Sequence, residues 1–183
     1  MEVISVKHKA DIIKGEYQFA DKVKSEVLSL LKVCNPIPQD NSNVKASIHT
    51  EWDWEPDNIT FRNLKAYIRE EIEKHYKSGA RSSGERYYLK VTNFWANVYK
   101  KGDYAQSHSH KPSAFSFAYF VKSKWYYPPL VFSDSGKRIR PKEGTFVAFP
   151  AYLMHHVPQH RYNDTRITLS GNLTIKRSLE YRL

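Results

Sequence analysis

The chain has 183 residues, the length of one domain or of one domain with a decorated terminus. Apolar residues make up 40% and aromatic residues 14% of the composition, enough for a hydrophobic core, which excludes wholesale disorder. No apolar run approaches the roughly 20 residues of a membrane span. The single cysteine, Cys34, excludes an internal disulfide framework and a cysteine-based zinc site. Residues 1–15 carry charges and lack the apolar stretch of a signal peptide, so we expect a cytoplasmic protein.

The basic residues outnumber the acidic residues by 29 to 19, and the net charge of +10 is unevenly distributed. Residues 1–110 hold 17 basic and 15 acidic residues, whereas residues 111–183 hold 12 basic and 4 acidic residues. A local basic surplus favours an anionic substrate or partner, nucleic acid included. A surface adapted only for solubility has the same composition, and no recognition-helix, zinc-finger or RNP-type motif accompanies the charge.

Apolar residues at helical spacing predict two helices in the first part of the chain. The first covers roughly 19–33 and ends before a proline-rich segment. The second is capped by Asn58 or Thr60 and is expected to stop at Gly79. Its apolar stripe consists of Phe61, Leu64, Ile68, Ile72 and Tyr76.

Strand patterns dominate the rest of the chain. Residues 36–58 read as a long loop with one short strand at Val44–His49. Further strands are expected at Tyr87–Tyr99, Ala114–Val121, Pro129–Phe132, Thr145–Phe149 and Arg166–Thr174. Both faces of Ala114–Val121 are apolar or small, which predicts burial on both sides. The fold class is therefore mainly β with N-terminal helices (α+β), with an antiparallel barrel or sandwich at its centre.

Histidines gather in one region, where five of the eight lie between residues 108 and 160. His108 and His110 form a His-x-His pair whose rings would point the same way on an extended strand. His155 and His156 follow an apolar strand, and their alternation lets only one of them face inward. Three imidazoles from two strands can hold Fe, Zn, Cu or Ni, although a lone His-x-His pair also arises by chance on surfaces.

An arginine and a hydroxyl share one face of the last expected strand, at Arg166 and Thr168. A guanidinium inside a barrel needs an anionic partner, and a carboxylate is the natural one. An outward-facing arginine explains this segment equally well. Four other histidines, His49, His75, His156 and His160, are expected to be surface or loop residues.

Six segments of the chain are similar, in their order and spacing, to the motifs of a known family. The segments are Asn97–Tyr104, His108-x-His110, Ser116–Val121, Lys142–Pro150, His155-His156-Val157 and Arg166-x-Thr168-x-Ser170-x-Asn172. Together they resemble the 2-oxoglutarate/Fe(II)-dependent oxygenase superfamily, specifically a branch with a His-x-His segment before a Ser-Gly-Val-Tyr-Tyr-type strand. The resemblance covers roughly residues 87–175.

The resemblance implies a double-stranded β-helix (jelly-roll) core at 87–175 within a single domain 1–183. Residues 1–86 would be a helical and loop support, and 176–183 a C-terminal tail. It further implies an enzyme that uses Fe(II), 2-oxoglutarate and O2, and that hydroxylates a substrate with release of succinate and CO2. The substrate and the oligomeric state do not follow from it.

Roles carry over from the family to six positions of this chain. His108 matches the first metal-binding histidine and His155 the distal one. Arg166 matches the arginine that binds the C5 carboxylate of 2-oxoglutarate, with the Thr168 hydroxyl beside it. Tyr99 matches, across a small gap, a tyrosine that hydrogen-bonds the same carboxylate. The sixth position is His110, which takes the place of a metal-binding carboxylate.

Two departures from the family pattern keep other interpretations open. His110 stands where the family usually has Asp or Glu, and neither Asp103 nor Asp134 has the spacing to replace it. Phe120 stands where many relatives have tyrosine. One alternative is a cupin-like three-histidine metalloenzyme that does not use 2-oxoglutarate. Another is a non-catalytic jelly-roll that binds an anionic polymer through its basic half.

Overall fold

The computed structural model describes residues 9–34, 42–54, 58–76 and 85–179. Within these residues the chain forms the helices α1 (Ala20–Leu30) and α2 (Ile59–His75). The strands are β1 (Ile13–Glu16), β2 (Val44–Lys45), β3 (Ile48–His49), β4 (Glu85–Tyr99), β5 (Tyr104–His108), β6 (Phe115–Lys122), β7 (Leu130–Phe132), β8 (Arg138–Ile139), β9 (Thr145–Pro150), β10 (His155–Val157) and β11 (Arg166–Leu179).

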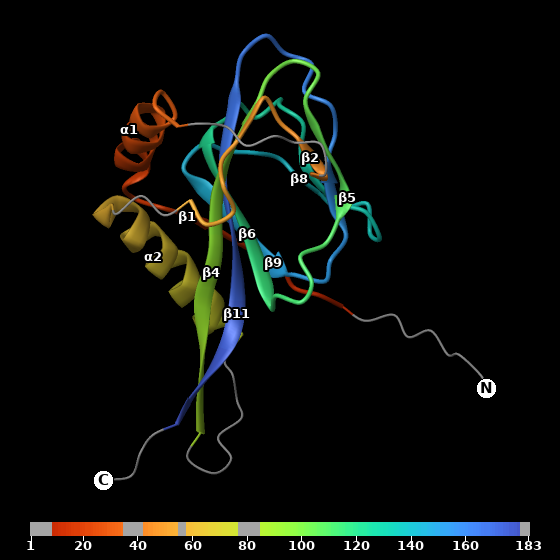
Figure 1. The fold of residues 1–183 in the computed structure, drawn as a ribbon. Helices are drawn as coiled ribbons and strands as arrows, with labels where there is room; N and C mark the ends of the chain where they lie inside the picture. The colour runs from red at the N-terminus through yellow and green to blue at the C-terminus, as the bar shows by residue number, and fades with distance from the viewer. Residues whose placement is uncertain (1–8, 35–41, 55–57, 77–84, 180–183) are drawn as a thin grey trace, which may run out of the picture.

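The strands form two antiparallel sheets that face one another. The major sheet has the order β1-β9-β6-β11-β4-β3, and the minor sheet has the order β2-β5-β10-β7-β8. Figure 1 shows both helices on one side of the long strands β4 and β11, with β2, β5 and β8 on the other side. The expected α+β class, mainly β with N-terminal helices, is confirmed. Neither helix among the described residues is long and apolar enough to cross a membrane.

Both predicted helices are present and pack on the outer face of the major sheet. α1 lies within the predicted range 19–33. α2 begins after Asn58, whose side-chain oxygen accepts a hydrogen bond from the Thr60 amide at 2.7 Å and so satisfies one of the free N–H groups of the first turn. α2 ends at His75, and the predicted stop at Gly79 lies outside the described residues.

The major sheet is buried on both faces, so two hydrophobic cores form. β9 shows the alternation: Phe146 and Ala148 pack under the helices, whereas Val147 and Phe149 pack between the sheets. The two faces of β6 are also both covered, as the sequence predicts for Ala114–Val121. Packing is so close at Gly171 of β11 that a Cβ atom there would lie 2.6 Å from the Phe117 ring.

The five predicted strands after residue 86 are all present as β4, β6, β7, β9 and β11, with ends that coincide with the prediction or differ by up to five residues. The predicted strand Val44–His49 is two strands, because the chain passes there from the minor to the major sheet. β1, β5, β8 and β10 are strands that the sequence pattern does not predict, and β1 brings the N-terminal segment into the major sheet beside β9. β11 continues to Leu179, beyond the expected end of the core at residue 175.

Candidate metal and anion site

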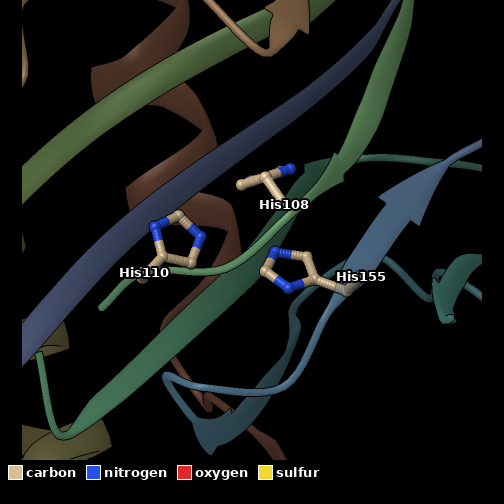
Figure 2. Close-up of side chains that lie close together, drawn as sticks. All are labelled: His108, His110 and His155. Carbon is tan, nitrogen blue, oxygen red and sulfur yellow. The ribbon is translucent and has the colours of Figure 1, made fainter. Parts of the chain in front are cut away.

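Three histidines lie together at one end of the space between the sheets (Figure 2). His108 ends β5 and His155 begins β10, where the two residues are direct partners in the antiparallel register. His110 follows β5 in a loop rather than on the strand itself, held by a 2.8 Å hydrogen bond from its backbone N–H to the Ala151 carbonyl. One ring nitrogen from each histidine lies within 4.8 Å of those of the other two.

Backbone carbonyls fix the protonation of two of these rings. Nδ1 of His108 lies 2.7 Å from the Gln106 carbonyl, and Nδ1 of His155 lies 2.9 Å from the Leu153 carbonyl. Since a carbonyl can only accept, Nδ1 carries the proton in both rings, and Nε2 keeps its lone pair. This is the arrangement of histidines that bind a metal through Nε2. The donor set therefore fits a first-row metal ion.

The histidine cluster is electrically neutral at ordinary pH. Burial, helped by repulsion from His155 and His108, lowers the pKa of His110 to about 3. Burial and repulsion from His108 lower the pKa of His155 to about 4. The pKa of His108 is also lowered, chiefly by burial. Neutral imidazoles are the form that binds metals, so the folded chain presents these rings ready for an ion.

No carboxylate joins the cluster among the described residues. The Asp103 carboxylate accepts hydrogen bonds from the Ser47 and Lys100 amides at 2.6 and 2.7 Å, which holds it in the turn after β4. Asp134 is exposed in the turn after β7.

Two histidines expected at the surface or in loops, His49 and His160, are instead buried, each with a ring nitrogen against a backbone carbonyl.

Arg166 is a buried cation at the start of β11. Only 2% of the residue is exposed, and its guanidinium lies over the rings of Tyr99 and Phe120 at 5.4 and 5.5 Å. Its Nη1 donates to the Pro128 carbonyl at 2.8 Å, whereas the buried Nε has no hydrogen-bond partner within the described ranges. Burial lowers the pKa of this guanidinium. An anionic ligand would supply the partner that this buried charge lacks.

All six residues singled out by the sequence line one cavity between the sheets. They are His108, His110, His155, Arg166, Thr168 and Tyr99, and the cavity measures about 50 Å³. The antiparallel register explains part of this arrangement, because Arg166 is opposite Tyr99 and Thr168 is opposite Asn97. Burial raises the pKa of Tyr99 to about 12, against the opposing effect of the Arg166 charge. The phenol is therefore protonated and able to donate.

Three further polar residues line the same cavity and were missed by the sequence reasoning: Trp95, Asn97 and Ser170. The indole Nε1 of Trp95 and the amide Oδ1 of Asn97 are buried, and neither has a hydrogen-bond partner in the part of the chain that the structure describes. The signal that could have found these residues is the two-residue period of β4 and β11. It places 95, 97 and 99 on one face opposite 170, 168 and 166.

No protein-family model and no curated protein matches the sequence. Solved structures do match its fold. A viral collagen prolyl hydroxylase from Paramecium bursaria Chlorella virus-1, solved as a complex with 2-oxoglutarate, is 14% identical, with 91% of this chain and 96% of that chain covered and a TM-score of 0.64. HygX from Streptomyces hygroscopicus, with nickel and 2-oxoglutarate bound, is 8% identical, with 90% and 83% covered and a TM-score of 0.62.

A third similar structure is a prolyl hydroxylase from Trichoplax adhaerens in complex with a peptide fragment of hypoxia inducible factor. It is 13% identical, with 89% of this chain and 83% of that chain covered and a TM-score of 0.65. Each of the three comparisons covers between 89% and 91% of this chain. The chain thus has the fold of the prolyl hydroxylases and of the 2-oxoglutarate/Fe(II) oxygenases.

Proposed function

We propose that the protein is an Fe(II)- and 2-oxoglutarate-dependent oxygenase that hydroxylates a substrate with release of succinate and CO2. One observation carries the proposal: a neutral three-histidine cluster lines the same cavity as a buried arginine that has no anionic partner among the described residues. A metal-chelating dicarboxylate would bind a metal held by the histidines at one end and pair with the arginine at the other. The similar structures that contain 2-oxoglutarate support the same ligand.

Each of the six residues has a role in this proposal. His108, His110 and His155 hold the iron, the first two contributing from β5 and the loop after it. Arg166 pairs with the C5 carboxylate of 2-oxoglutarate, and the hydroxyls of Thr168 and Tyr99 donate to it. When bound, iron and 2-oxoglutarate supply the oxidising chemistry together with O2.

The protein's own part is orientation and the exclusion of water. The carbonyls of Gln106 and Leu153 keep two of the imidazoles in the tautomer that leaves Nε2 free. The aromatic rings on both sides of Arg166 hold the guanidinium in place and keep water from it. The two sheets would then form a double-stranded β-helix (jelly-roll), with 87–175 as its core and 1–86 as support.

The test is metal analysis of protein purified without oxygen, followed by a 2-oxoglutarate decarboxylation assay. We expect about one iron per chain and succinate formation that requires both iron and 2-oxoglutarate. His155→Ala should abolish metal retention, whereas Arg166→Ala should retain the metal and raise the 2-oxoglutarate concentration needed for turnover. Full turnover by either variant would contradict the assigned roles.

His110 favours one second candidate, a three-histidine metalloenzyme that does not use 2-oxoglutarate. The cluster lacks the carboxylate of the usual triad, and three neutral imidazoles bind several first-row metals. Arg166 would then bind a carboxylate of the substrate itself. Retained metal without any succinate formation or 2-oxoglutarate binding would support this candidate over the first.

A further inference from the structure

The cavity carries one more positive charge than a site with a metal-binding carboxylate. A divalent ion held by neutral His108, His110 and His155 keeps both its charges, and Arg166 adds a third. 2-Oxoglutarate neutralises only two of the three. No acidic side chain lines the cavity in the described part of the chain, so one positive charge remains without a partner. An uncompensated charge in a buried site is costly.

A second, independent feature lies beside His110. The ring of Trp95 is 5.8 Å from the ring of His110, and the buried indole N–H has no acceptor among the residues that the structure describes. An indole N–H can only donate, so a ligand that satisfies it must bring an acceptor. Ser170 is the direct partner of Trp95 across the β4–β11 register and also lines the cavity, which adds a hydroxyl that can donate.

The Trp95 indole and the Ser170 hydroxyl lie two same-face residue pairs away from Arg166 in the β4–β11 register. Along β11, Arg166, Thr168 and Ser170 alternate on one face, so Ser170 lies about 13 Å along the strand from Arg166. The C5 carboxylate of 2-oxoglutarate at Arg166 therefore does not reach Trp95 and Ser170, and the metal-chelating end of 2-oxoglutarate is already counted in the charge balance. The remaining positive charge calls for a second anion at the histidine end, where the Trp95 N–H and the Ser170 hydroxyl can donate to it.

We infer that the site accepts a second anion next to His110, in contact with Trp95 and Ser170, and that the substrate presents a carboxylate or phosphate group there. The inference rests on the proposed function and adds the class of substrate to it. His110 is the specificity-determining residue, because a carboxylate at this position would cancel the charge that attracts the anion.

Two variants of matched size isolate this charge. His110→Asp introduces the negative charge, and His110→Asn introduces a neutral side chain of the same shape. The full chain is loaded with Co²⁺, whose visible absorption reports its ligands, and saturated with 2-oxoglutarate. Acetate is then titrated as the probe for a substrate carboxylate, with chloride as a second probe and metal-free protein as the control for binding elsewhere on the basic surface.

We expect the wild type and His110→Asn to bind acetate at least about tenfold more tightly than His110→Asp, from the Coulomb energy of one unit charge at contact distance. Trp95→Phe should weaken acetate binding by about three- to tenfold, through the loss of one hydrogen bond to a charged group. Equal acetate affinities in the Asp and Asn variants would overturn the inference. Binding of chloride without acetate would show a halide site and overturn the assignment of the substrate.

The same experiment separates this inference from the proposed function. Cobalt content and 2-oxoglutarate affinity are measured before acetate is added. If either is absent in the wild type, the proposed function fails and the inference fails with it. If both are present and acetate does not discriminate between the variants, only the inference fails.

Discussion

At the scale of single residues, Arg166 combines a cost to the fold with a proposed role in binding. Its guanidinium is buried without a carboxylate partner among the described residues. Replacing even a buried ion pair by apolar side chains of similar volume is often neutral or stabilising by about 1–4 kcal/mol, and a charge without a carboxylate partner has no ion-pair attraction to lose. We expect Arg166→Met to unfold at the wild-type urea concentration or above it, in the absence of ligand.

The same substitution should remove the stabilisation by 2-oxoglutarate. In the presence of Ni²⁺ and 2-oxoglutarate at 100 times its dissociation constant, the wild type should gain about 2.7 kcal/mol. Arg166→Met should gain little, whereas Arg140→Met, a change at an exposed arginine that lies over Trp125, should respond as the wild type does. A ligand response in Arg166→Met equal to that of the wild type would remove Arg166 from the binding site.

Residue spacing predicts which residues of this site gather, but not their full surroundings. His-x-His and Arg-x-Thr are visible in the sequence because each pair shares one strand or its extension. Trp95 and Asn97 are not visible in this way, since an indole and an amide in an aromatic strand read as packing residues. Their place in the cavity depends on the β4–β11 register, which pairs residues about 70 positions apart along the chain.

At the scale of elements, the start of α2 offers a clean test of a predicted cap. Asn58 accepts a hydrogen bond from the Thr60 amide, and its own amide donates to the Glu26 carboxylate at 3.0 Å, which ties α2 to α1. Asn58→Ala removes both contacts, whereas Asn58→Ser keeps a capping oxygen and loses only the contact with Glu26. We expect the alanine variant to be less stable than the serine variant by about 1 kcal/mol in urea denaturation. Equal stability would mean that the cap contributes nothing.

The longest elements are predictable from the sequence, whereas several of the short strands are not. α2 and β4 each extend over enough residues for a periodic pattern to show. β8 has two residues and β10 has three, too few to define a period of two. These strands exist because neighbouring strands offer backbone hydrogen bonds, as β7 does for both. β10 is the important omission, since its pairing with β5 sets His155 opposite His108.

At the scale of the whole molecule, the two cores on opposite faces of the major sheet have different roles. The core under α1 and α2 contains most of the large buried side chains, and the core between the sheets surrounds the cavity. Residues 111–183 carry a basic surplus, and among the basic residues of this range that the structure describes only Arg166 is buried. Composition alone could not separate this one cation from the solvated ones.

The stability of the metal-free molecule should depend on pH through the histidine cluster. In the folded state the pKa of His110 is about 3 and that of His155 about 4, against 6.5 for the ordinary group. The unfolded chain therefore binds more protons than the folded chain between those values. The contribution of these histidines to the free energy of unfolding should be fully present above about pH 6.5. It should fall as the pH is lowered toward 4, by up to about 1.4 kcal/mol per pH unit for each such histidine.

Urea denaturation of the metal-free protein at pH 7 and pH 5 measures this loss. His110→Asn removes one of the buried imidazoles, so the difference between the two pH values should be smaller than in the wild type. Asn58→Ala removes no titrating group and should lower the stability equally at both pH values. If His110→Asn loses as much stability as the wild type on acidification, other groups couple folding to pH, and the neutral state of the cluster no longer follows from its burial.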